Sequence, residues 1–233
     1  DRKTRGLARL PGKVSRLALV VALALIAGAP TRAQPVPPQN VAFERWARET
    51  FFGGYKPASP TQRWDVPATA NRERGGVPVT FKAATHGAAV ELGDALRQYE
   101  IDEPFLMIVA YWQPGANPGR VVQVLPLAIS AVQWRKLWGP VTYADLQKLD
   151  GVMRDTGPTV EETRRRVLAM KNAPPFSQAI IQLNPRIDER GPRRLQCSLR
   201  YRDIITHLAP GTNPDPQKPA TLYGVAVPAP AAG

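Results

Sequence analysis

The chain has little cysteine and little histidine, and these two scarcities exclude whole classes of site. Cys197 is the only cysteine among 233 residues, so the chain cannot form an internal disulfide, and a zinc site built from cysteines is excluded. His86 and His207 are the only histidines, which argues against a metal centre with several histidine ligands. Any metal site would be built mostly from carboxylates, the ligands that suit Mg²⁺.

Long apolar runs are also missing. The longest, Leu17–Ala29, spans 13 residues, whereas a membrane-crossing helix needs about 20. It follows a basic segment and precedes a small-x-small tripeptide at 31–33, an order typical of a secretory signal. No stable membrane association is expected for the mature domain. Because the sequence opens without Met, a second interpretation stays open, in which synthesis starts near Val41 and the protein is cytoplasmic rather than periplasmic or secreted.

Acidic residues are fewer than basic ones, 19 against 31, which gives a formal net charge of +12. Residues 1–40 carry seven Lys or Arg and one Asp, so the rest of the chain holds the other half of this excess. A basic balance of this size favours a polyanionic partner without proving one. Hydrophobic residues make up 43% of the chain and charged residues 21%, values that fit a globular protein with one sizeable core.

The order of the expected elements predicts one mixed α/β (α+β) domain over 41–209, with a central mixed sheet flanked by helices. Helical spacing predicts helices over 41–52, 88–99, 131–139, 142–155 and 159–171. Apolar or alternating runs predict strands over 77–84, 104–112, 120–129, 177–184 and 193–201. Residues 1–40 are expected to be a signal-like or spurious extension that ends in a Pro-rich linker, and 210–233 a disordered Pro- and Ala-rich tail.

Four ionisable residues fall on successive predicted elements. Glu44 lies in the first helix and Asp65 in an extended segment. Lys82 ends the next strand, and Glu91 lies on the polar side of the helix predicted over 88–99. Metal-dependent hydrolysis of phosphodiesters uses such groups, because carboxylates hold Mg²⁺ and an adjacent lysine can position or deprotonate a water molecule.

At these residues the sequence resembles the restriction-endonuclease-like, PD-(D/E)xK nuclease superfamily. The stretches WDVPA and GGVPVTFKAA carry the motif, and a wider likeness to type II restriction-enzyme-like sequences covers most of 41–209. The resemblance implies a restriction-endonuclease-like fold, with Asp65 and Glu91 as ligands of Mg²⁺. It further implies Lys82 as the catalytic lysine and Glu44 as an accessory acidic residue.

The sequence departs from this motif at two positions. Trp64 stands where the motif has proline, and Thr80 where it has an acidic residue, so Glu91 is the expected replacement for the missing carboxylate. The resemblance also implies double-stranded DNA as substrate, and a homodimer, because cleavage of a duplex needs two sites. Four arginines would contact phosphates or bases: Arg186, Arg190, Arg193 and Arg194.

Other interpretations remain beside this one. Lys82 also fits a solvent-facing position at a strand end, and Glu91 fits the wet face of an amphipathic helix. Thr80 favours a nuclease-fold protein that binds nucleic acid without cutting it. The leader-like segment before residue 34 favours an exported envelope binding protein instead.

Overall fold

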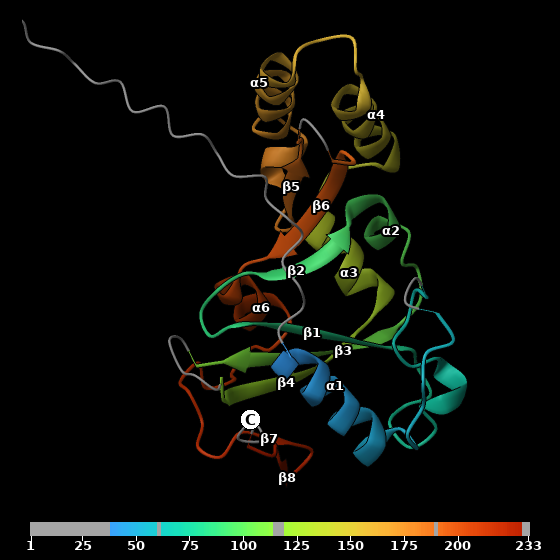
Figure 1. Cartoon of the computed structure of the whole chain (residues 1–233), viewed down its shortest axis with the longest axis vertical. Helices are drawn as coiled ribbons and strands as arrows, with labels where there is room; N and C mark the ends of the chain where they lie inside the picture. Colours follow the sequence, from blue (N-terminus) through green and yellow to red (C-terminus); the bar gives the residue numbers. More distant parts are fainter. Residues whose placement is uncertain (1–37, 60–61, 114–118, 189–190, 230–233) are drawn as a thin grey trace, which may run out of the picture. The chain divides into compact units, whose positions relative to one another are not determined.

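The structure is a computed structural model that describes residues 38–59, 62–113, 119–188 and 191–229. Over these residues the chain is mixed α+β, as predicted, with six α-helices and eight strands in three sheets (Figure 1). The signal-like segment up to residue 37 and Arg190 lie outside the described residues. Within the described part, no helix combines the length and the apolar character needed to cross a membrane.

The elements follow one another with short connections. The helices are α1 (Pro38–Phe51), α2 (Ala95–Tyr99), α3 (Ala131–Trp138), α4 (Tyr143–Arg154), α5 (Val160–Lys171) and α6 (Tyr201–His207). The strands are β1 (Val79–Thr85), β2 (Val90–Asp94), β3 (Phe105–Trp112), β4 (Val121–Ile129), β5 (Gln182–Arg186), β6 (Arg194–Leu199), β7 (Thr221–Leu222) and β8 (Val225–Ala226). The first sheet has the order β1-β3-β4, the second β2-β6-β5, and β7 and β8 form a hairpin.

The first sheet is covered on both faces. Its central strand β3 pairs in parallel with β1 and antiparallel with β4, and all eight of its residues are buried. Because alternate residues of a strand point to opposite faces, Leu106 and Ile108 pack in one apolar cluster with Phe43 of α1. Phe105 and Met107 pack in the other cluster, which α3 and the second sheet complete. Cover on both sides explains the continuous apolar run in the sequence.

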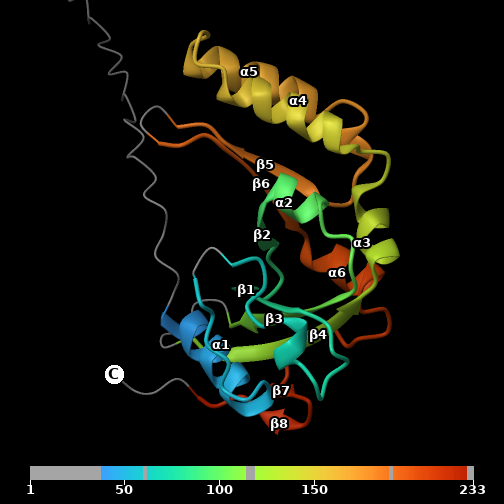
Figure 2. The same ribbon diagram turned by 90° about the vertical axis from the view of Figure 1, so that its right-hand side faces the viewer.

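The second sheet is antiparallel, and one of its faces is buried. Leu195 and Cys197 of β6 point into the larger cluster, where they join apolar side chains of α4 and α5. Figure 2 shows these two helices side by side along the β5–β6 ribbon. The three predicted helices of this region are confirmed. They begin as expected because Ser130, Thr142 and Thr159 each accept a hydrogen bond from the backbone N–H three residues on.

The helix predicted over 88–99 is wrong in its first half. Residues Val90–Asp94 form β2, which pairs with β6, and only Ala95–Tyr99 are helical. Gly93, with φ of +101°, lies at an irregularity in the pairing of β2 with β6, and Asp94 caps α2 by accepting a hydrogen bond from the backbone N–H of Arg97. The apolar positions of this segment fit both the helical period of about 3.6 residues and the strand period of two residues, and pairing with β6 favoured the strand.

The prediction of a disordered tail after residue 209 is also wrong for its described part. Leu222 of β7 is fully buried in the cluster beneath α1, together with Ala220. Gln217 N donates to Val122 O at 2.6 Å, which ties the segment to β4. Residues after Pro210 therefore complete the core of the first sheet, although their Pro-rich composition is typical of disorder.

Candidate functional site

The candidate site lies at the open edge of β1, where Asp65 is fixed by backbone pairing. Val66 and Val79 form an antiparallel bridge, in which Val79 N donates to Val66 O at 2.8 Å. Asp65 N donates to Val79 O at 2.9 Å. The Asp65 carboxylate then turns back onto the strand, where its Oδ2 accepts from Phe81 N at 2.7 Å and from Thr80 Oγ1 at 3.1 Å. Two hydrogen bonds hold this side chain against β1.

Lys82 follows directly on the same strand. Val79 and Phe81 point towards α1, so Thr80 and Lys82 lie on the opposite face of β1. Lys82 is partly buried, and its ammonium forms no hydrogen bond or ion pair with any described residue. Burial lowers the pKa of Lys82, and the negative charges of Asp65 and Glu44 oppose this shift. Because its pKa is lowered, a larger fraction of this lysine is in the neutral form, the only form that can accept a proton.

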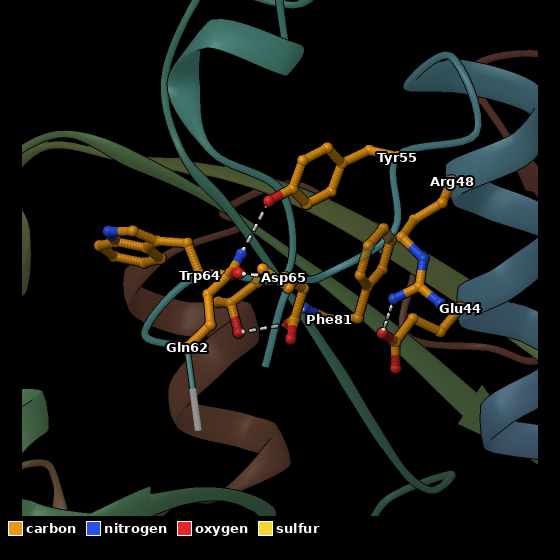
Figure 3. A network of polar contacts seen from close by, with 9 residues as sticks. Glu44, Arg48, Tyr55, Gln62, Trp64, Asp65 and Phe81 are labelled. Atoms are coloured by element: carbon orange, nitrogen blue, oxygen red, sulfur yellow. Dashed lines mark hydrogen bonds and ion pairs between the residues drawn. The ribbon is translucent and has the colours of Figure 1, made fainter. Parts of the chain in front are cut away.

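Glu44 joins the pair from α1. Its carboxylate is half-buried and forms an ion pair with Arg48, one helical turn further on (Figure 3). Burial raises the pKa of Glu44, and the charge of Asp65 raises it further, whereas Arg48 and Lys82 lower it. The charges of Asp65 and Lys82 thus act on Glu44, although α1 packs on the Phe81 face of β1 and Lys82 lies on the other face.

Side chains that the sequence did not mark support this arrangement. Gln62 donates to Trp64 O at 2.5 Å and to the hydroxyl of Tyr55 at 3.3 Å, so it braces the chain just before Asp65 (Figure 3). Thr80 also has a role that the motif comparison missed, because its hydroxyl donates to Asp65 where the motif would place a second carboxylate. Only Arg48 had a sequence signal, its i, i+4 spacing from Glu44 on a helix.

Glu91 is not part of the site, which corrects its assignment as a metal ligand. It lies on β2, opposite Ser198 of β6, and its side chain is exposed. Because Val90 and Leu92 are buried, the alternation of the strand sends Glu91 to the solvent face. Among the described residues no group of three acidic, histidine or cysteine side chains is placed to hold a metal ion. The carboxylates whose charges act on Lys82 are Asp65 and Glu44.

The arginines predicted to bind nucleic acid fall into different environments. Arg193 donates to Met153 O at 3.0 Å and also to Asp155 O, so its guanidinium caps the carboxyl end of α4 and is committed to the fold. Arg186 donates to Gln196 at 3.1 Å and remains exposed. Arg194 is exposed and has no hydrogen bond or ion pair with any described residue.

The chain was also compared with known proteins. No model of a known protein family, no curated protein and no solved structure matches it. The chemistry of the site therefore rests on the geometry of Glu44, Asp65 and Lys82.

Proposed function

We propose that the protein is a Mg²⁺-dependent endonuclease that hydrolyses DNA phosphodiester bonds in the manner of a type II restriction enzyme. The observation that carries this proposal is the place of Lys82, a partly buried lysine on the strand that binds the Asp65 carboxylate, with no hydrogen bond or ion pair to any described residue. Structural lysines in ion pairs have their pKa raised, so a lysine kept partly buried without a partner is costly for folding alone. Such groups occur where a proton must be moved.

The proposed ligands of Mg²⁺ are Asp65 and Glu44. This ion is held in proteins by one or two carboxylates and keeps several waters, and Glu44 and Asp65 supply two. One oxygen of Asp65 is engaged by Thr80 and Phe81, which leaves its second oxygen for an ion. Burial is the larger cause of the raised pKa of Glu44, and the charge of Asp65 adds to it, a repulsion that a bound cation would relieve. Bound there, Mg²⁺ would polarise the phosphate and lower the pKa of a water molecule.

The protein side chains would supply the proton transfer and the positioning. Hydrolysis joins the oxygen of a water molecule to phosphorus and breaks the bond from phosphorus to the leaving sugar oxygen. Lys82 in its neutral form can take the proton that the water loses, and solvent can protonate the leaving oxygen. In its charged form Lys82 would stabilise the extra negative charge on the phosphate. The basic excess outside residues 1–40, half of the total of +12, suits duplex DNA as substrate, and two sites in a homodimer would serve its two strands.

A second candidate function is favoured by Thr80. Its hydroxyl donates to Asp65 from the position at which the motif has a second carboxylate, so the site offers a metal ion one carboxylate fewer than the motif does. A protein with a weakened metal site could bind DNA without cutting it. That alternative predicts binding that weakens with salt and does not respond to Mg²⁺.

The test uses the full chain with supercoiled plasmid, with and without Mg²⁺. We expect Mg²⁺-dependent cleavage that Lys82→Met and Glu44→Gln abolish. The matched control is Lys136→Met, which removes an exposed lysine of α3 that has no hydrogen bond or ion pair with described residues. Cleavage that survives both site variants would overturn the assignment of these residues, and DNA binding without any cleavage would favour the second candidate.

A further inference from the structure

The outward face of the β5–β6 ribbon carries polar side chains only, and it passes from buried at Ser198 to exposed at Arg186 and Arg194. The register places Gln182 opposite Ser198, Asn184 opposite Gln196, and Arg186 opposite Arg194. Leu183, Leu195 and Cys197 lie between these pairs and point the other way, into the core. Three successive cross-strand pairs on one face therefore consist of amides, a hydroxyl and guanidinium groups.

The pairing of Arg186 with Arg194 is unfavourable for the fold itself. Like charges directly opposite each other on antiparallel strands repel. Each arginine is exposed, and neither forms an ion pair with any described acidic residue. Asp94 of β2 lies opposite Gln196, two residues from Arg194 on the same face of β6, but its carboxylate is engaged in capping α2. No ion pair among the described residues compensates the repulsion between these two arginines, and an anionic ligand would do so.

The neighbouring amides narrow the choice of ligand. Asn184 donates to Ser198 Oγ at 2.8 Å, which leaves its carbonyl oxygen free to accept. Gln196 accepts from Arg186 Nε at 3.1 Å, which leaves its own NH₂ and the terminal nitrogens of Arg186 free to donate. Asparagine and glutamine pair with adenine edges and arginine with guanine edges, whereas a site for phosphate alone needs only positive charge.

We propose that the outward face of the β5–β6 ribbon, formed by Asn184, Arg186, Arg194 and Gln196, enters the major groove of duplex DNA and reads its bases. The proposal rests on the proposed function in taking DNA as the partner. A two-stranded ribbon fits the major groove, and successive pairs on one face lie roughly 7 Å apart, about two base-pair steps. Arg193 is excluded from this surface, because it is engaged with the end of α4.

The test is DNA binding by the full chain in EDTA, so that cleavage does not interfere, measured by fluorescence anisotropy on a labelled duplex of mixed sequence. We expect Arg194→Ala to weaken binding roughly tenfold or more. The control Arg165→Ala removes the same charge from an exposed position on α5 that has no hydrogen bond or ion pair with described residues, and we expect less than a threefold effect. Equal effects of the two variants would overturn the proposal.

A thermal unfolding measurement separates an effect of Arg194→Ala on DNA recognition from an effect on the stability of the fold. Because Arg194→Ala removes a repulsion, we expect its melting temperature to equal or exceed that of the parent, and a clear fall would overturn the proposal. Asn184→Ala and Gln196→Ala should reduce discrimination between A·T-rich and G·C-rich duplexes with little change in salt dependence. If binding depends on Arg194 but the chain cuts no DNA, the proposed nuclease activity is refuted and the DNA-reading surface stands. If cleavage requires Lys82 but is unchanged by substitution of Arg186 and Arg194, the DNA-reading surface is refuted and the nuclease activity stands.

Discussion

Two substitutions of Asp65 should separate its role in the fold from its role in chemistry. Asp65 Oδ2 accepts from the backbone N–H of Phe81 and from the hydroxyl of Thr80, both of which belong to buried residues. Asp65→Ala leaves both donors without this acceptor, and a buried donor left unpaired costs about 1–3 kcal/mol. Because the Thr80 hydroxyl can rotate, we expect a total loss of about 2–4 kcal/mol in the free energy of unfolding.

Asp65→Asn keeps one acceptor oxygen at the same place, so it should cost about 1 kcal/mol or less. Both variants should lose Mg²⁺-dependent plasmid cleavage by at least about 10²-fold, because both remove the charge that would hold the ion. Urea unfolding followed by circular dichroism measures the first quantity, and a nicking assay the second. Equal destabilisation by Ala and Asn would refute the hydrogen-bond reasoning, and an Asn variant that still cuts DNA would refute the site.

Three further predictions concern other parts of the molecule. Burial lowers the pKa of Lys82, so the folded state loses stability as pH falls below the unfolded pKa near 10.5, and the loss is complete below the folded pKa. In urea at neutral pH, Lys82→Met should therefore be more stable than the parent, and above the unfolded pKa the two should be equally stable. Cleavage by Lys82→Met should be about 10²–10⁴-fold slower. Leu222→Ala should lower the free energy of unfolding by about 2–5 kcal/mol, because the side chain is fully buried, whereas Val225→Ala, at 42% exposed, should change it little; similar effects would refute the packing of the tail. Arg193→Ala should cost about 1–3 kcal/mol by uncapping α4 while leaving DNA affinity within about threefold, and a stable variant with lost binding would reverse its assignment.

Strong local patterns made most of the fold predictable. The run Phe105–Trp112 is apolar at every position, and such a run fits a strand with cover on both faces. The capping residues Ser130, Thr142 and Thr159 mark helix starts that depend only on residues three positions away. Interactions that are complete within a few residues can be read from the chain, because no distant partner changes them.

The site was only partly predictable for the same reason. Asp65 and Lys82 were predicted because the proposed chemistry needs those residue types near a strand end, and both lie at β1, where Asp65 accepts hydrogen bonds from Phe81 and Thr80. Glu91 was assigned from a helical period, but its segment pairs with β6, whose residues lie about a hundred positions later in the chain. The local pattern around Glu91 does not reveal a strand partner so far along the chain. Because the segment is a strand and not a helix, the Glu91 side chain points to solvent.

The sequence by itself determined the mixed α+β class and excluded an internal disulfide and cysteine-built zinc sites, and it predicted Asp65 and Lys82 as site residues. Only the tertiary structure decided that Thr80 binds Asp65, that Arg193 serves a helix end, and that Leu222 completes the core. These outcomes depend on contacts between segments far apart in the chain. Burial and hydrogen bonding in the folded state stabilise these contacts, and the local sequence around each residue does not show which distant residue it will contact.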